Sequence, residues 1–344
     1  MTGGNEDSAT RVLFCGPNFP GSHNYTQEYL QSHPSIVVDI IPFDAVPDVI
    51  GNYDICVSKD MKITSNIIAR AGNRLKLIMQ FGVGIEGMIS TSLSFFFFFR
   101  SHITQVLVFC HEGIDVGAAT KHGIKVGRIP SDTTGNASSC AEMAIYLMMG
   151  LLRKQNEMQA SLKKRSLGYP IGDTLLGKTV FILGYGNIGK HLAKRLRPFG
   201  VKIVATKRSW YSPKQGSFQS DDGSNDDLVD VKGVHEDIVK YASISDIVVC
   251  CLSMSSETAG IVDDVFVSSM KKGSLLVNIS RGGLLDYDAV VKNLESGHLG
   301  GLAIDVAWRE PFEPDDAVLK FPNVIVTPHV AGVTECSYRA MAKV

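Results

Sequence analysis

The chain has little of what marks membrane, secreted or nucleic-acid-binding proteins. It has 34 Lys and Arg against 35 Asp and Glu, a formal net charge of −1, so no basic excess indicates a nucleic-acid partner. The cleanest apolar stretches, such as 144–152, are far too short to span a bilayer. Residues 1–10 are polar and acidic, and they match neither a secretory signal nor an Arg-rich transit peptide. We therefore expect a cytoplasmic protein that binds neither membrane nor nucleic acid.

Cysteines are also sparse, and no C-x-x-C pair occurs among them. The seven are Cys15, Cys56, Cys110, Cys140, Cys250, Cys251 and Cys336. An odd, dispersed set in apolar surroundings is typical of reduced core thiols in an intracellular protein. We therefore expect no metal site.

Strand-like apolar runs recur along the whole chain and alternate with helical stretches. The first half contains runs at 11–15, 36–41, 53–57, 75–79 and 124–127. The second half contains runs at 179–183, 201–205, 247–252, 275–279, 302–306 and 324–327. This alternation predicts parallel sheets with helices on both faces, and 344 residues suffice for two cores. We therefore predict an α/β protein of two doubly wound domains, with a helix over 139–153 crossing between them.

A glycine motif, G-x-G-x-x-G, directly follows the apolar run 179–183. Its glycines are Gly184, Gly186 and Gly189, and Asn187 and Ile188 complete it at the start of a predicted helix. The order strand, tight turn, helix is the context in which this motif binds a dinucleotide, with the pyrophosphate at the helix N-terminus. The alternative is a glycine-rich turn that holds no ligand.

The next predicted strand, 201–205, is followed by basic rather than acidic residues. An NAD site usually has Asp or Glu about 20 positions after the first glycine, to bind the ribose 2′-hydroxyl. Here no acidic residue occurs between Val201 and Ser220, and Lys207, Arg208 and Ser209 occupy the expected position. Since two cations attract a 2′-phosphate, we predict that NADP(H) is preferred and NAD(H) is possible. The alternative is that both residues simply end a strand in solvent.

Three chemically useful residues follow the last predicted strands. Arg281, Glu310 and His329 come after the runs 275–279, 302–306 and 324–327. In an open parallel sheet, ligands bind at the carboxyl ends of strands. Arginine can grip a carboxylate with two hydrogen bonds, and histidine exchanges protons near neutral pH. A neighbouring glutamate stabilises the imidazolium form and fixes the tautomer of the imidazole.

Taken together, these motifs resemble the D-isomer-specific 2-hydroxyacid dehydrogenases. The resemblance extends from the glycine motif through Arg281-Gly282-Gly283, Asp305 and Glu310-Pro311 to the segment 327–332, Thr-Pro-His-Val-Ala-Gly. That family includes phosphoglycerate dehydrogenase and the hydroxypyruvate and glyoxylate reductases. It implies a flavodoxin-like substrate domain at 10–135 and a Rossmann nucleotide-binding domain at 136–322. The chain would then return to the substrate domain at 323–344, as a truncated C-terminal helix.

The resemblance also implies a role for each site residue. Arg281 would orient the substrate carboxylate and carbonyl, His329 would protonate the carbonyl oxygen, and Glu310 would pair with His329. The backbone at Val83 and Gly84 would hold the substrate carboxylate. Asp305 would contact the nicotinamide carboxamide. The protein would be a homodimer.

Two segments depart from the pattern of that family. Residues 88–113 separate Gly87 from Ile114 and contain five consecutive Phe, which match neither helix nor strand periodicity. Our hypothesis is that this insert is translated intron or another gene-model error. Residues 211–233 are rich in Ser, Gly and Asp, and predict a long surface loop.

The predicted function is hydride transfer between NAD(P)H and a small 2-oxo or 2-hydroxy acid, working as an NADPH-dependent reductase. Two alternatives remain open. One is a nucleotide-binding scaffold like the corepressors that share this fold. The other is an inactive product of a mis-spliced transcript.

Overall fold

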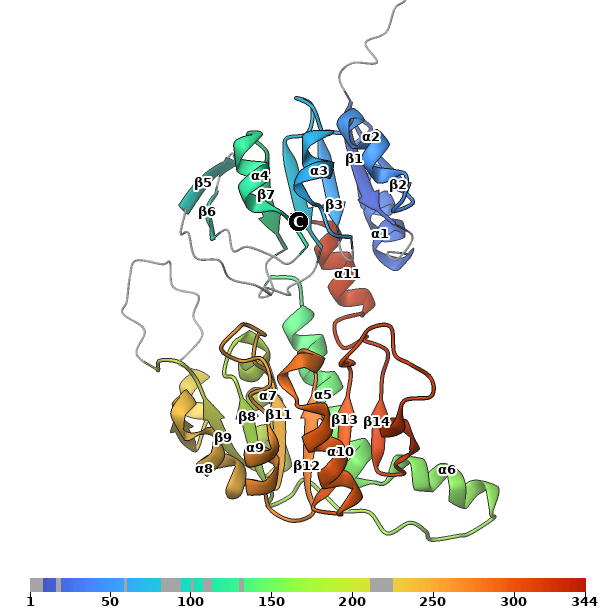
Figure 1. The fold of residues 1–344 in the computed structure, drawn as a ribbon, viewed down its shortest axis with the longest axis vertical. Coiled ribbons are helices and arrows are strands. Elements are labelled where there is room, and N and C mark those ends of the chain that lie inside the picture. Colours follow the sequence, from blue (N-terminus) through green and yellow to red (C-terminus); the bar gives the residue numbers. More distant parts are fainter. Residues whose placement is uncertain are drawn as a thin grey trace, which may run out of the picture. The chain divides into compact units, whose positions relative to one another are not determined.

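A computed structural model describes residues 9–16, 20–58, 61–81, 94–99, 102–107, 113–129, 133–210 and 225–344. The chain divides into two compact units, shown in Figure 1. The first comprises Met1–Gly135 and Glu335–Val344, and the second comprises Asn136–Thr334. Among the described residues, no helix combines the length and apolar character needed to cross a bilayer.

The first unit is built on a five-stranded parallel sheet in the order β2-β1-β3-β4-β7. Its strands are β1 (Thr10–Cys15), β2 (Ile36–Ile41), β3 (Ile55–Ser58), β4 (Leu77–Gln80) and β7 (Lys125–Arg128). Because successive strand residues face opposite sides, Leu13 enters one apolar cluster and Phe14 enters another. The strand order is that of flavodoxin-like folds, as predicted.

Helices cover this sheet. They are α1 (Pro20–Leu30), α2 (Val46–Val49), α3 (Ser65–Ala69), α4 (Val116–Lys121) and α11 (Glu335–Ala342), with a short 3-10 turn, η2 (Ile50–Asn52). The C-terminal helix α11 joins α1 through Arg339, which pairs with Glu28 at 3.0 Å and lies over the Tyr25 ring. Asp115 begins α4, since its side chain accepts a hydrogen bond from the Ala118 N–H at 2.8 Å.

The second unit contains a seven-stranded parallel sheet in the order β10-β9-β8-β11-β12-β13-β14. Its strands are β8 (Thr179–Leu183), β9 (Lys202–Thr206), β10 (Val231–Gly233), β11 (Ile247–Cys250), β12 (Ser274–Asn278), β13 (Leu299–Ile304) and β14 (Val324–Val326). The order reverses between β8 and β11, which is the point where doubly wound sheets bind dinucleotides. The predicted α/β class and Rossmann domain are therefore confirmed.

Helices lie on both faces of this sheet (Figure 1). They are α5 (Asn136–Leu152), α6 (Gln155–Lys163), α7 (Asn187–Leu196), α8 (Ile238–Ser243), α9 (Asp264–Ser269) and α10 (Tyr287–Glu295). The 3-10 turns are η3 (Arg197–Phe199), η4 (Asn225–Leu228), η5 (His235–Asp237), η6 (Gly282–Leu284) and η7 (Ala317–Lys320). Val180 and Ile182 of β8 face the cluster that contains α5, whereas Phe181 and Leu183 face the opposite cluster.

Two boundary predictions need correction. The predicted loop 211–233 ends in structure, because 231–233 form β10 and pair with Val204, Ala205 and Thr206 of β9. The predicted return to the substrate domain at 323 is also wrong. Residues 324–326 form the edge strand β14, and the return follows Thr334. As a strand of the large sheet, the apolar run 324–327 buries the side chains of Val324 and Ile325, and this burial of apolar surface stabilises the arrangement.

The phenylalanine run does form a strand, contrary to its periodicity. β5 (Ser94–Phe99) pairs antiparallel with β6 (His102–Leu107). These two strands make a separate sheet, and neither pairs with a strand of the five-stranded sheet among the described residues. The short segment after the insert packs into the first unit, since Ile114 is buried and forms a β-bridge with Ile63.

Joining Gly87 directly to Ile114 should raise the melting temperature and the yield of folded protein. A two-stranded sheet is marginal by itself, so its loss removes little stability, while removal of five Phe reduces aggregation. A melting curve and an expression trial on both chains test this. If the shortened chain fails to fold while the full chain folds, the insert is a genuine structural element.

Candidate active site

The glycine turn after β8 is shaped to hold a dinucleotide. Gly184 has φ +105°, and a Cβ there would lie 2.8 Å from the Leu252 nitrogen, so only glycine fits. A Cβ on Gly189 would lie 2.6 Å from the Gly184 oxygen, which explains the close approach of α7 to the strand. A Cβ on Gly186 meets nothing within 4 Å, so the turn is open there. Gly186 precedes α7 and has no side chain to cap it, which leaves the positive helix end for a phosphate.

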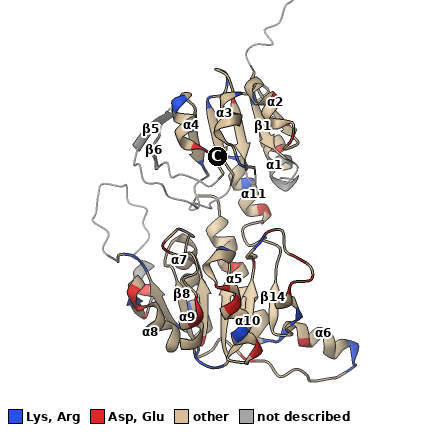
Figure 2. Ribbon diagram, viewed as in Figure 1, with Lys and Arg blue, Asp and Glu red and all other residues tan. Residues whose placement is uncertain are grey.

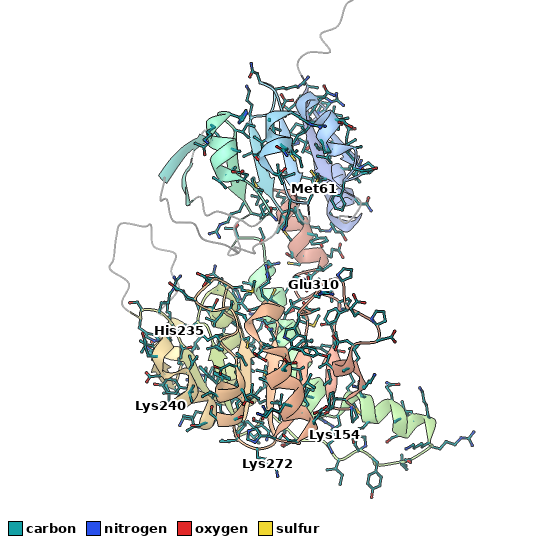
Figure 3. All side chains as sticks on the ribbon, in the orientation of Figure 1. Met61, Lys154, His235, Lys240, Lys272 and Glu310 are labelled. Carbon is teal, nitrogen blue, oxygen red and sulfur yellow. The ribbon has the colours of Figure 1, made fainter. Side chains whose placement is uncertain are left out.

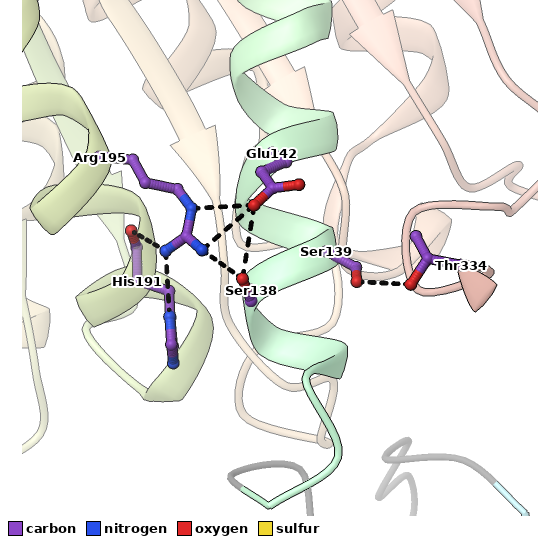
Figure 4. Close-up of polar contacts among 6 residues, drawn as sticks. All are labelled: Ser138, Ser139, Glu142, His191, Arg195 and Thr334. Carbon is purple, nitrogen blue, oxygen red and sulfur yellow. Dashed lines mark hydrogen bonds and ion pairs between the residues drawn. The ribbon is translucent and has the colours of Figure 1, made fainter. Parts of the chain in front are cut away.

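The helix α7 is fastened to α5 by a polar cluster (Figure 4). Arg195 of α7 donates hydrogen bonds to Ser138 and to Glu142 of α5, the latter at 3.2 Å. It also donates to Nδ1 of His191, one turn earlier, at 3.1 Å. This arginine therefore fixes the helix that starts at the glycine turn.

Arg281 leaves the end of β12 with its backbone held by polar side chains. The Asn278 amide donates to the Arg281 carbonyl at 2.8 Å and accepts from the Ser280 N–H at 3.0 Å. The Ser280 hydroxyl donates to the Cys250 carbonyl at 3.0 Å, which ties this turn to β11. Gly282 follows because a Cβ there would clash with the Ala307 carbonyl.

Glu310 and His329 form the pair that the sequence predicts. His329 Nδ1 lies 3.0 Å from Glu310 Oε1 and 2.9 Å from Oε2. The carboxylate also accepts the Ala307 N–H at 3.1 Å, so it is fixed from two sides. With Nδ1 bound to a carboxylate, Nε2 is the ring nitrogen left for a reacting group. His329 itself adopts φ +56°, a strained conformation for a non-glycine residue.

Asp305 holds the loop that carries His329. It is fully buried, and its carboxylate accepts hydrogen bonds from the Thr327 hydroxyl at 2.5 Å, the Val330 N–H at 2.9 Å and the Ala331 N–H at 2.7 Å. These three bonds bracket His329 on both sides. The predicted contact of Asp305 with the nicotinamide carboxamide remains a prediction.

The charges of this group interact. Burial alone would raise the pKa of Glu310, but the His329 hydrogen bond and charge, the Ala307 N–H and the Arg281 charge lower it overall. Burial lowers the pKa of Arg281, and the nearby Glu310 charge opposes that shift. The charges of Arg281 and Glu310 therefore interact electrostatically. The site combines one cation with one hydrogen-bonded Glu-His pair.

The remaining predicted site residues fall in two places. Lys207, Arg208 and Ser209 follow the carboxyl end of β9, next to the glycine turn, because the Tyr185 N–H donates to the Thr206 carbonyl at 2.8 Å. Val83 and Gly84 lie outside the described residues.

A cavity of about 300 Å³ occurs elsewhere in the second unit, at the amino ends of the strands. Its lining includes Lys178, Asp246, Lys272 and Asn323, each of which precedes a strand. Figure 3 shows Lys272 at one end of this unit and Glu310 at the other. The cavity therefore belongs to a different edge of the sheet from the residues described above.

Sequence reasoning missed the supports of this site. Asn278 and Ser280 stand in the same Val-Asn-Ile-Ser-Arg run as Arg281, and their polarity beside a buried strand was a usable signal. The bracketing of His329 by Asp305 offered no such signal, because the partners are 22 to 26 positions apart.

The chain was compared with known proteins. Residues 145–331 match the family model described as D-isomer specific 2-hydroxyacid dehydrogenase, NAD binding domain. Hydroxypyruvate reductase of Thermotoga maritima is 30% identical over 301 residues, which cover 85% of this chain and 82% of that protein. The chloroplastic D-3-phosphoglycerate dehydrogenase 2 of Arabidopsis thaliana is 28% identical over 88% of this chain, which spans only 42% of that longer protein. A glyoxylate reductase from Paecilomyes thermophila shares the fold, with TM-score 0.71, 24% identity and coverage of 97% and 92% of the two chains.

The chain therefore belongs to the D-isomer specific 2-hydroxyacid dehydrogenase family. The resemblance drawn from its motifs is confirmed. The matched region contains the glycine turn, Arg281, Glu310 and His329.

Proposed function

We propose that this protein is an NADPH-dependent reductase of small 2-oxo acids, which it converts to 2-hydroxy acids. The observation that carries the proposal is the Glu310–His329 pair near Arg281, at the same sheet edge as the glycine turn. A bound nicotinamide supplies or accepts the hydride. The rest of the chemistry is done by side chains of this chain.

Each of the three residues has one task in the proposed reaction. The Arg281 guanidinium holds the substrate carboxylate and polarises the neighbouring carbonyl. His329 gives a proton from Nε2 to the carbonyl oxygen as the carbonyl carbon is reduced, and takes it back in the oxidative direction. Glu310 holds the imidazole through Nδ1 and stabilises its protonated form. Since proton and hydride must reach one carbonyl together, a fixed acid beside a charge clamp suffices.

Turnover of NADPH with a panel of 2-oxo acids tests this function. Oxidation of NADPH with formation of the matching 2-hydroxy acid supports it. Tight NADPH binding with no turnover on any acid favours a nucleotide-binding scaffold, and absence of both favours an inactive product.

The cofactor preference is proposed from charge. Lys207 and Arg208 should favour NADPH over NADH, since each charge-assisted hydrogen bond to a phosphate contributes roughly 1.5–3 kcal/mol. Replacing Lys207 with Asp and Arg208 with Ala should reverse the preference, as measured by equilibrium titration with both cofactors. Tighter binding of NADH to the unaltered chain would show that the two cations only end a strand.

We also propose that the protein is a homodimer joined through the segment around α6. Leu167 is 98% exposed, and Leu162, Tyr169, Ile171 and Leu176 are each at least two-thirds exposed. Figure 1 shows α6 extending away from the seven-stranded sheet. In a dimer, a second copy of this chain would cover the exposed apolar side chains of this segment and remove them from water. Replacing Leu167 and Ile171 with Asp should convert dimers to monomers in sedimentation equilibrium, and a monomeric unaltered chain would refute the proposal.

A cytoplasmic location is proposed as well. Cys15 and Cys56 are buried thiols with sulfurs 3.4 Å apart, an arrangement suited to a reducing compartment. Fractionation of cells that express the natural full-length protein tests this, and recovery in an organelle would contradict it.

A further inference from the structure

Two lysines, Lys207 and Lys232, meet where β9 and β10 end, and Arg208 follows the first of them in the chain. Lys207 and Arg208 directly follow β9, and Lys232 lies in β10, opposite Ala205 of β9. The Lys207 N–H donates to the Gly233 carbonyl at 3.1 Å, which joins the two strand ends. Sequence reasoning named the first two residues but not Lys232, because β10 was expected to be loop. Figure 2 shows Lys and Arg in blue at this corner, beside α8.

The aromatic ring of Trp210 lies beside two of these cations. The Nζ atoms of Lys207 and Lys232 lie 5.7 Å and 5.5 Å from the centroid of the Trp210 ring. The Trp210 indole N–H donates to the Gly233 carbonyl at 2.7 Å, which fixes the ring. Its other neighbour is Tyr185, between the first two glycines of the motif, at 5.3 Å between centroids. The ring therefore connects the basic corner to the glycine turn.

These cations are not neutralised within the described part of the chain. Several cations elsewhere in this unit pair with carboxylates, such as Arg197 with Asp230 at 2.9 Å and Lys271 with Asp246 at 2.8 Å. Lys207, Arg208 and Lys232 have no such ion pair among the described residues, although Glu236 and Asp237 follow β10 closely. Two ammonium groups beside one ring repel each other, and a bound anion would relieve that repulsion.

We propose that Lys232, positioned by Trp210, binds the 2′-phosphate of NADP(H) together with Lys207 and Arg208, and so determines cofactor specificity. A phosphate monoester carries about −1.5 to −2 charges near neutral pH, so more than one cation is needed to balance it. The adenosine ribose of a dinucleotide lies at the end of the strand that follows the glycine helix, which here is β9. This inference rests on the proposed preference for NADP(H).

Calorimetric titration with two nucleotides tests it without any turnover. Adenosine 2′,5′-bisphosphate and 5′-AMP differ only in the 2′-phosphate. Lys232→Met should weaken binding of the bisphosphate by about tenfold or more and leave 5′-AMP within about twofold. Lys202→Met is the matched control, because Lys202 is an exposed lysine at the opposite end of β9, and it should change neither affinity.

The outcomes separate this inference from the cofactor proposal. If the unaltered chain binds both nucleotides equally, the NADP(H) preference fails and the inference fails with it. If the unaltered chain prefers the bisphosphate and Lys232→Met keeps that preference, only the role of Lys232 is overturned. Equal weakening of both nucleotides by Lys232→Met would also overturn it, because the effect would not depend on the 2′-phosphate.

Discussion

Arg281→Ala should reduce kcat/KM for every 2-oxo acid by about 100-fold or more and leave NADPH affinity unchanged. Loss of two parallel, charge-assisted hydrogen bonds to the substrate carboxylate should cost on the order of 3 kcal/mol of transition-state stabilisation. The Arg281 guanidinium donates one hydrogen bond to the Ser280 carbonyl, but the Asn278 side chain holds the backbone of the turn separately, so we expect the turn to survive removal of the arginine side chain. Steady-state kinetics and a cofactor titration on the same preparation measure both quantities.

Arg281→Lys is the informative companion to this variant. Lysine keeps the positive charge but cannot form two parallel hydrogen bonds, so its kcat/KM should fall between those of the alanine variant and the unaltered chain. Turnover like that of the unaltered chain in Arg281→Ala would remove this residue from the mechanism.

His329→Ala should slow turnover by roughly 10²- to 10⁴-fold, the usual contribution of a positioned general acid. Binding of NADPH should persist, because the Asp305 carboxylate bonds to the residues on either side of His329 and not to its side chain. Pre-steady-state measurement of NADPH oxidation gives the rate of the chemical step. A His329→Ala variant with undiminished turnover would assign the proton to another donor.

Glu310→Gln tests the coupling of the pair through the pH dependence of the same reaction. In the folded chain the pKa of Glu310 is lowered, so the carboxylate stays ionised throughout the neutral range. The stability it contributes is present above its ordinary pKa and is lost as pH falls through the lower folded value. Glutamine has no titrating carboxyl group, so the loss of reductive activity at low pH that follows protonation of Glu310 should disappear from the pH profile of Glu310→Gln. Glu313 is an exposed carboxylate in the same loop, and Glu313→Gln should leave the pH profile unchanged.

Most strands of both sheets could be predicted from the sequence, because each is a short apolar run whose burial is decided locally. Runs such as 180–183 and 247–250 are buried on both faces, so they are apolar without interruption, apart from the terminal cysteine of the second. β10 could not be predicted, since its three residues follow a polar segment and gain their strand character from pairing with β9. The separate sheet of β5 and β6 likewise depends on pairing and not on periodicity.

The candidate site shows the same division. Arg281, Glu310 and His329 could be predicted because each follows a strand and carries a recognisable chemistry. The bonds from Asp305 to 327–331 and the meeting of Lys232 with Trp210 could not, because both join segments that only folding brings together. Such contacts leave no local pattern in the chain.

The location of the reactive side chains has a consequence for how this chain can change. Arg281, Glu310 and His329 all belong to the unit Asn136–Thr334, together with the glycine turn. The first unit can therefore accumulate substitutions, or be exchanged for that of a relative, while the Glu310–His329 pair keeps its mutual geometry, because the hydrogen bonds to Ala307 and Asp305 that hold it lie within the second unit. Sequence change in one half of the molecule thus leaves the geometry of this pair in the other half as it is.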